Sequence, residues 1–356
     1  MKTTFFGHTL QSPVIVGSGP MSYSAAGMIR LHRAGAGAVV TKTINRNAAR
    51  NPDRHMVQYG AGTLINCEKW SDYPMERWLE REIPAAVAAG VPCIASVGHT
   101  VEDSRLCVER LEDEGCIAIE LVSYDDATVL PMLEDTKKRV KIPVIVKLSP
   151  NSPDFLAHAK RCIDAGADAF TACDSMGPAL QIDIETGKPV LGGADGCGWL
   201  SGGMIRPFTL QKICALRQKT DLPIIGLGGV AKWQDGIEMV MAGADYIGVC
   251  SAVILQGPAF ITRMNEQIDS YLTGHGYQSL SDIRGLVQKH LPVPQGQGYE
   301  MEIDAAHCTH CGRCVRVCPY QARSFGEDGL PRIDKAACRK CGLCVSICKY
   351  LSFVQE

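Results

Sequence analysis

The chain has 356 residues, of which 46% are hydrophobic, so it exceeds one typical domain and is long enough to bury a large core. Its formal net charge is -2, so the chain lacks the excess of basic residues that attracts nucleic acid or anionic lipid. No nucleic-acid partner is therefore expected. The sequence contains neither the apolar core of a signal peptide nor a membrane span, which predicts a cytoplasmic protein that does not enter a membrane.

Short β-branched, apolar runs alternate with longer amphipathic stretches from residue 1 to about residue 290. Eight of the short runs are predicted strands: 13–17, 38–42, 92–97, 117–121, 143–147, 169–173, 223–227 and 245–249. Helical patterns such as 76–89 and 207–219 follow them, which predicts an α/β fold, a (β/α)8 TIM barrel. The alternative, a doubly wound open sheet, needs a G-x-G-x-x-G turn after its first strand, and GSGP at 17–20 does not supply one.

In such a barrel the chemistry lies where the strands end. Gly228 and Gly229 follow the seventh predicted strand, and Cys250 and Ser251 follow the eighth. Loops at these two places commonly bind phosphate, because glycine lets backbone N–H groups come close to the anion. These four residues are therefore predicted to form a phosphate site, and tight turns without a ligand are the alternative.

Lys42 and Lys147 each finish a predicted strand, and an ammonium at a barrel mouth is costly to desolvate unless it meets an anion. We expect one of them to face the N1–C2=O edge of a flavin, where it stabilises the anionic reduced ring; a structural ion pair is the alternative. Asn66 and Glu68 follow a glycine-bearing loop and precede no strand, a place typical of substrate-holding groups. An Asx turn is the alternative for this segment.

A linker at 291–300, rich in proline and glycine, is predicted between a barrel domain at 1–290 and a small α+β ferredoxin-like domain at 301–356. The second domain contains the spacing C-x2-C-x2-C-x3-C twice, which fits two [4Fe-4S] clusters whose fourth cysteines are exchanged. The ligand sets are Cys308, Cys311, Cys314 and Cys348 for one cluster, and Cys338, Cys341, Cys344 and Cys318 for the other. Zinc ribbons and disulfides are the alternatives, but paired zinc sites seldom repeat a three-cysteine core.

These segments together resemble the FMN- and cluster-containing half of dihydropyrimidine dehydrogenase, within the dihydroorotate dehydrogenase superfamily. The motifs that carry the resemblance are TKTI at 41–44, INCE at 65–68, VKLSPN at 146–151, LSGGMIRP at 200–207, GLGG at 226–229 and the C-terminal module. The resemblance implies FMN on the barrel and a substrate that touches Asn66 and Glu68. The expected flavin contacts are Gly17, Lys42, Thr43, Lys147, Ser201, Gly203, Gly228, Gly229, Cys250 and Ser251.

Two positions depart from that family. Its acid/base cysteine stands in an Asn-x-Ser-Cys-Pro-like run after the fourth strand, where this chain has ELVSYDD at 120–126. Tyr124 is the expected acid there, with Ser123 or no loop acid as the alternatives. After the sixth strand, Asp174 replaces a substrate-binding asparagine, and a carboxylate accepts hydrogen bonds but does not donate them. Asp174 and Ser175 are therefore expected to select a ligand that presents a donor or a positive charge.

The predicted function is an FMN- and iron–sulfur-dependent oxidoreductase that acts on a carbon–carbon bond next to a carbonyl-like group of a small molecule. Because no nicotinamide fingerprint occurs, electrons are expected to pass between the clusters and an external flavoprotein or ferredoxin. One alternative is a dihydropyrimidine or dihydroorotate dehydrogenase with a substituted acid. Another is a non-catalytic electron-transfer subunit. A homodimer is compatible with the sequence.

Overall fold

The computed structural model describes residues 1–123, 125–291 and 299–355. These fall into two compact units, Met1–Lys289 and His290–Glu356. Tyr124 and most of the predicted linker, residues 292–298, lie outside the described residues. In the part of the chain that the structure describes, no helix has the length and apolar character needed to cross a membrane.

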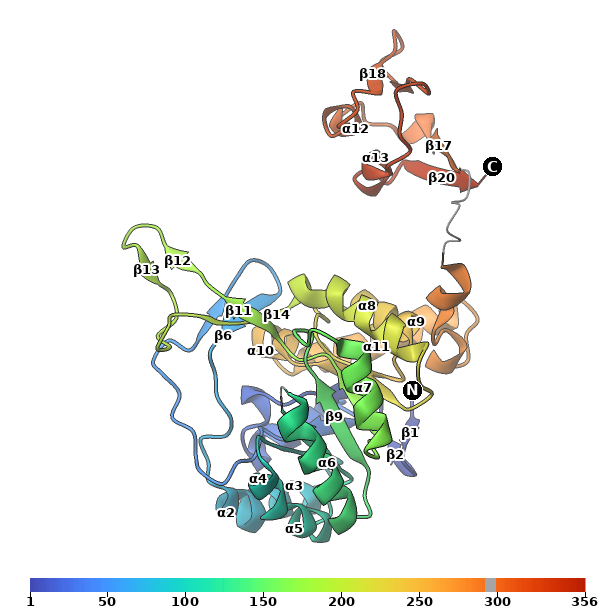
Figure 1. The fold of residues 1–356 in the computed structure, drawn as a ribbon. Coiled ribbons are helices and arrows are strands. Elements are labelled where there is room, and N and C mark those ends of the chain that lie inside the picture. Colours follow the sequence, from blue (N-terminus) through green and yellow to red (C-terminus); the bar gives the residue numbers. More distant parts are fainter. Residues whose placement is uncertain (124, 292–298, 356) are drawn as a thin grey trace. The chain divides into compact units, whose positions relative to one another are not determined.

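Eight parallel strands of the first unit close into a barrel in chain order (Figure 1). They are β3 (Val14–Val16), β4 (Ala38–Val40), β7 (Cys93–Val97), β8 (Ala118–Val122), β9 (Val144–Leu148), β10 (Ala169–Ala172), β15 (Ile224–Gly226) and β16 (Tyr246–Val249). Each predicted strand contains or overlaps one of them, so the predicted (β/α)8 barrel is confirmed. Pro92, Pro143 and Pro223 stand directly before β7, β9 and β15, where the missing N–H is tolerated.

Helices of this unit follow the barrel strands. They are α1 (Ala25–Arg33), α2 (Met75–Arg77), α3 (Ile83–Ala88), α4 (Val101–Arg105), α5 (Val108–Asp113), α6 (Asp126–Arg139), α7 (Phe155–Asp164), α8 (Arg206–Arg217), α9 (Trp233–Ala242), α10 (Ser251–Gln256) and α11 (Ala259–Gly274). The helix predicted at 76–89 is interrupted, because Trp78–Glu82 forms a π-helical turn between α2 and α3. Pro84 follows this turn and has no N–H to continue the regular pattern of hydrogen bonds.

Side chains along the barrel strands alternate between two cores. Ile15, Ile94 and Ile145 belong to the cluster inside the barrel, whereas strand neighbours such as Val14 and Val146 pack against the helices. The hairpin of β1 (Thr3–Phe5) and β2 (His8–Leu10) adds apolar side chains to the inner cluster. These pack with residues at the strand starts, so the hairpin covers the N-terminal end of the barrel and the candidate site lies at the opposite end.

A four-stranded antiparallel sheet accompanies the barrel. Its order is β11 (Met176–Ala179), β14 (Gly198–Gly202), β6 (Thr63–Asn66) and β5 (Met56–Gln58), and β14 places Trp199 opposite Asn66. The predicted glycine-bearing loop is the turn with Gly60 and Gly62, and it is followed by a strand outside the eight predicted ones, because Thr63–Asn66 pairs with strands on both sides. Beyond β11, the two-residue strands β12 (Ile182–Asp183) and β13 (Lys188–Pro189) form a hairpin that extends away from the barrel (Figure 1).

The second unit is a small α+β structure. Strand β17 (Tyr299–Ile303) pairs with β20 (Leu351–Gln355), and β18 (Arg323–Phe325) pairs with β19 (Pro331–Ile333). The short helices α12 (Arg313–Arg316) and α13 (Leu343–Ser346) begin after glycines with a left-handed backbone, Gly312 (φ 71°) and Gly342 (φ 81°). The two cysteine runs therefore share one local structure.

Candidate functional site

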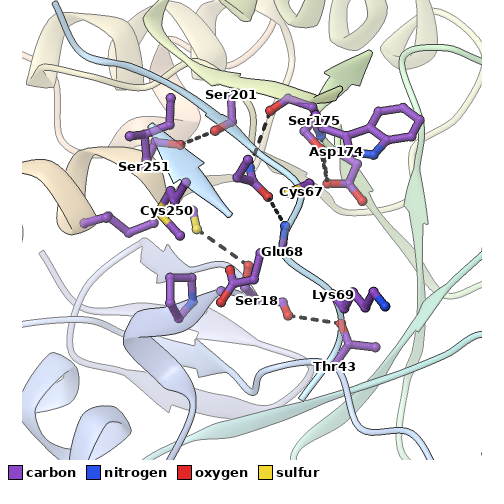
Figure 2. Close-up of a pocket in the computed structure, with 18 of the residues that line it drawn as sticks. Ser18, Thr43, Cys67, Glu68, Lys69, Asp174, Ser175, Ser201, Cys250 and Ser251 are labelled. Atoms are coloured by element: carbon purple, nitrogen blue, oxygen red, sulfur yellow. Dashed lines mark hydrogen bonds between the residues drawn. The ribbon is translucent and has the colours of Figure 1, made fainter. Parts of the chain in front are cut away.

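A cavity of about 820 Å³ lies at the end of the barrel where the strands finish, and its volume is in the range of small-molecule and cofactor sites. Twelve of the predicted site residues line it: Lys42, Thr43, Asn66, Glu68, Lys147, Asp174, Ser175, Ser201, Gly228, Gly229, Cys250 and Ser251. They come from the barrel loops and from the pairing of β6 with β14, so segments far apart in the sequence converge here (Figure 2).

Two buried lysines supply the positive charge of the cavity. Lys42 follows β4, and its Nζ lies 2.8 Å from Oε1 of Glu68. Lys147 is near the end of β9, and its Nζ lies 3.4 Å from Oδ1 of Asp174. The two lysines are only 5% and 7% exposed, so each ammonium has lost most of its water and needs the carboxylate beside it.

Hydrogen bonds fix the two segments that carry the carboxylates of these pairs. Asp174 accepts from the backbone N–H of Ser175 at 2.7 Å, and its own N–H donates to the Leu148 carbonyl at 2.9 Å. Asn66 accepts from the backbone N–H of Glu68 at 3.3 Å, which is the Asx turn considered as the alternative for this segment. Asn66 therefore both shapes the turn and lines the cavity.

Glycines leave room for a ligand at one side of the cavity. Gly228 and Gly229 have φ values of 102° and 121°, and a Cβ on Gly229 would lie 2.4 Å from Cα of Arg206. No side chain fits there, and both glycines line the cavity with their backbone. Nearby, the Ser251 hydroxyl donates to Oγ of Ser201 at 2.9 Å (Figure 2). A recess bounded by glycine and hydroxyl groups suits a phosphate.

Cys250 adds no charge to this recess. Its thiol donates to the carbonyl of Ser18 at 3.6 Å (Figure 2). Burial raises the pKa of the Cys250 thiol to about 11, so the group stays protonated at neutral pH. An uncharged thiol does not repel an anion, which is compatible with the predicted phosphate site.

A polar layer lies between the apolar interior of the barrel and the cavity. On the inward faces of the strands, Ser96 of β7 is the register partner of Glu120 of β8, and Lys147 of β9 is the register partner of Thr171 of β10. Glu120 accepts from the Thr171 hydroxyl at 2.7 Å. Burial raises the pKa of Glu120, and the nearby Lys147 ammonium opposes this shift. Glu120 is not among the predicted site residues, although a charged residue inside an apolar strand is a visible signal.

Three predicted site residues do not line the cavity. The Ser123 hydroxyl hydrogen-bonds that of Thr128 in α6. Gly17 donates its N–H to the Val249 carbonyl as part of the barrel, and Gly203 donates to the carbonyl of Gly62. Tyr124, the preferred acid, lies outside the described residues.

The cavity also has lining residues outside the predicted set. Among them are His99, Trp70, Trp199, Cys67 and Asn51. His99 is the second residue after β7, so the rule that sites lie at strand ends applies to it as well. The others belong to segments 50–56, 66–70 and 193–202, which reach the cavity through long-range pairing and carry no strand-end signal.

In the second unit, cysteines from the two runs lie near one another. A small cavity is lined by Cys318 together with Cys338, Cys341 and Cys344. Burial raises the pKa of Cys314, and the thiol of Cys348 adds to this shift, which places these two residues close together. Among the described residues, no three His, Cys, Asp or Glu side chains converge as the ligands of a single metal ion would. A four-iron cubane instead takes one thiolate per iron.

Comparison with known proteins gives two family matches. Residues 1–272 match the dihydroorotate dehydrogenase family, and residues 300–349 match the 4Fe-4S dicluster domain. Both matches agree with the predicted superfamily and cluster module, and they do not point to dihydropyrimidine dehydrogenase in particular.

Similar proteins include three named dihydroorotate dehydrogenase B (NAD(+)), catalytic subunit. The one from Methanothermobacter thermautotrophicus is 30% identical over 305 residues, covering 80% of this chain and 98% of that protein. The one from Pyrococcus furiosus is 31% identical over 303 residues, covering 81% and 99%. The one from Thermococcus kodakarensis is 32% identical over 297 residues, covering 79% and 95%.

The glycine recess gives a direct test of where the flavin phosphate binds. Gly229→Ala places a methyl group against Arg206 and forces a strained backbone, so the purified protein is expected to retain little FMN. Flavin content per chain measures this. The control is Gly274→Ala at the end of α11, where nothing lies within 4 Å of the added carbon. Full FMN occupancy in the Gly229 variant would contradict the assignment.

Proposed function

We propose, since the chain belongs to the dihydroorotate dehydrogenase family, that it is an FMN- and iron–sulfur-dependent dehydrogenase acting on a carbon–carbon bond next to a carbonyl-like group. The observation that carries the proposal is the cavity at the barrel mouth. It combines two buried lysines, an uncharged glycine recess and polar side chains from the antiparallel sheet.

The residues around the cavity fit FMN. The volume of the cavity suits a cofactor of that size. The recess at Gly228, Gly229, Cys250 and Ser251 would hold the phosphate. Lys147 would lie along the N1–C2=O edge of the ring, where its charge favours the reduced, anionic form. When bound, the flavin supplies hydride transfer and also passes single electrons, which protein side chains alone do not provide.

The second unit supplies the route for electrons in this proposal. Eight cysteines would hold two [4Fe-4S] clusters, with the fourth cysteine of each run bound to the cluster of the other run. The position of Cys318 beside the cysteines of the second run supports this exchange. The electrons then pass to or from a separate protein, either a flavoprotein or a ferredoxin. The relatives are named as catalytic subunits, which favours a separate partner protein that exchanges electrons with a soluble electron carrier.

Substrate recognition is assigned to Asn66, Glu68, Asp174 and Ser175. All four line the cavity, and two of them pair with the lysines. The Asp174 carboxylate accepts hydrogen bonds from Ser175 and lies beside Lys147, so it would select a substrate group that donates a hydrogen bond. A carbonyl oxygen facing Asp174 would be repelled.

A second candidate is dihydroorotate oxidation itself, and the names of the relatives favour it. An anaerobic panel separates the candidates. Oxidised protein is mixed with dihydroorotate or dihydrouracil, and protein reduced by dithionite is mixed with orotate, uracil or cyclohexenone, while flavin absorbance is followed.

We expect at least one of these compounds to change the redox state of the flavin. A reaction confined to dihydroorotate and orotate would establish the second candidate. If the clusters reduce the flavin but no compound exchanges electrons with it, the proposal of a dehydrogenase is wrong and the protein is an electron-transfer subunit.

Paired cysteine variants test the exchange of cluster ligands. With exchanged ligands, Cys318→Ala with Cys341→Ala removes ligands from one cluster only, so about four of about eight irons should remain. Cys311→Ala with Cys318→Ala damages both clusters and should leave almost no iron. Iron content per chain is the measurement, and Cys214→Ala, outside the runs, is the control. If the Cys311/Cys318 variant instead retained about half of the iron and the Cys318/Cys341 variant retained almost none, each run would bind its own cluster.

A further inference from the structure

The proposed reaction needs a group that exchanges a proton with the substrate, and the loop after β8 does not present Ser123 for this role. The Ser123 hydroxyl is bonded to Thr128, and the residue does not line the cavity. Glu68 and Asp174 do line it, but each is paired with a lysine. Glu120 lies below the cavity in the polar layer and is only 1% exposed.

His99 is a titratable residue in the cavity that the proposed function has not used. It follows β7, lines the cavity and is only partly buried. Its ring lies edge-on to that of Trp70, with 5.7 Å between the centroids. An imidazole in this position is open to the ligand space and has an aromatic side chain on one flank.

The backbone of the His99 loop is fixed at several points. The N–H of His99 donates to Oδ2 of Asp103 at 3.1 Å, and Asp103 also caps the start of α4. The carbonyl of Gly98 accepts from Nδ2 of Asn45 at 2.9 Å. A loop held from α4 and from the segment after β4 keeps its side chain in one place, as proton transfer requires.

The loop also lies directly against the end of β8. A Cβ on Gly98 would be 2.6 Å from the Val122 carbonyl oxygen, so only glycine allows this close approach. The same carbonyl forms a hydrogen bond with the His99 ring. One ring nitrogen is thereby oriented by the backbone. His99 thus contacts the end of β8, the strand that precedes the predicted acid.

The charges around the ring set its protonation state. Burial lowers the pKa of His99 from its usual 6.5, and Lys147 lowers it further, whereas Asp103, the Val122 carbonyl and Asp174 raise it. The net direction is downward, so the imidazole is mostly neutral at pH 7. A neutral imidazole can take a proton from a substrate, and the imidazolium formed can return it.

We propose that His99 is the catalytic acid/base of the dehydrogenation, a role that rests on the proposed function. In the oxidising direction, the C–H bond beside the carbonyl-like group breaks, His99 gains the proton, and the bonding pair becomes the second bond of the C=C unit. The neighbouring carbon loses a hydride, the two-electron equivalent that a bound flavin accepts. In the reducing direction the same proton returns from the imidazolium.

The kinetic test uses dihydroorotate as the probe and follows anaerobic flavin reduction by stopped flow. His99→Gln keeps an N–H that can reach Val122 but cannot exchange a proton, so the rate should fall by about 10²-fold or more. The wild-type rate should rise with pH through a pKa below 6.5 and then level off, and the variant should lose this limb. His99→Ala should recover activity with added imidazole, while His275→Gln, at an exposed position, should match wild type.

A second measurement needs no substrate. Diethyl pyrocarbonate modifies neutral imidazoles, and peptide mass spectrometry reports the rate at each histidine from about pH 5 to pH 8. His99 in the FMN-loaded protein should react with a midpoint below 6.5.

The kinetic and the modification measurements distinguish a failure of the role of His99 from a failure of the proposed function. If wild-type protein does not react with dihydroorotate, that substrate is excluded and the modification experiment alone decides the inference. An unreactive His99, or a His99→Gln variant with the wild-type rate and pH profile, would overturn the role of His99 and leave the proposed dehydrogenase intact.

Discussion

Two ammonium groups buried at the mouth of the barrel impose the main constraint on this protein. An ammonium removed from water is costly unless an anion stays close to it. Glu68 and Asp174 provide those anions, the first from the segment after β6 and the second from the loop after β10. The same pairings hold both segments at the cavity. A barrel mouth built on fixed positive charge is suited to a cofactor that becomes anionic when it is reduced.

Strand register decides the depth of each group in the site. Along β7 to β10, side chains that point inward change from apolar at the strand starts to polar near the ends, where Ser96 pairs in register with Glu120 and Lys147 with Thr171. Groups that would tune the cofactor therefore stand on rigid strands, whereas His99 and Asp174, which would act on the substrate, stand on the loops above. Loop changes can then alter the substrate without moving the cofactor.

The sequence was sufficient for the features that depend on local pattern. Alternating apolar runs identified all eight barrel strands, and strand ends identified Lys42 and Lys147 at the cavity. It was insufficient where placement depends on distant segments. Strand β6 is stabilised by pairing with β14, more than a hundred residues later, and no local pattern reveals that partner. Ser123 has a hydroxyl suited to proton transfer, but its bond to Thr128 depends on how α6 begins.

The central claim is that Lys147 lies against a flavin and favours its reduced form. Anaerobic measurement of the FMN midpoint potential in wild type and in Lys147→Gln tests it most directly. Loss of a charge-assisted hydrogen bond costs about 1.5 to 3 kcal/mol, which for a two-electron couple corresponds to a potential lowered by about 30 to 60 mV. The account predicts a fall of that size with FMN still bound. An unchanged potential at full occupancy would show that Lys147 is only the ion-pair partner of Asp174.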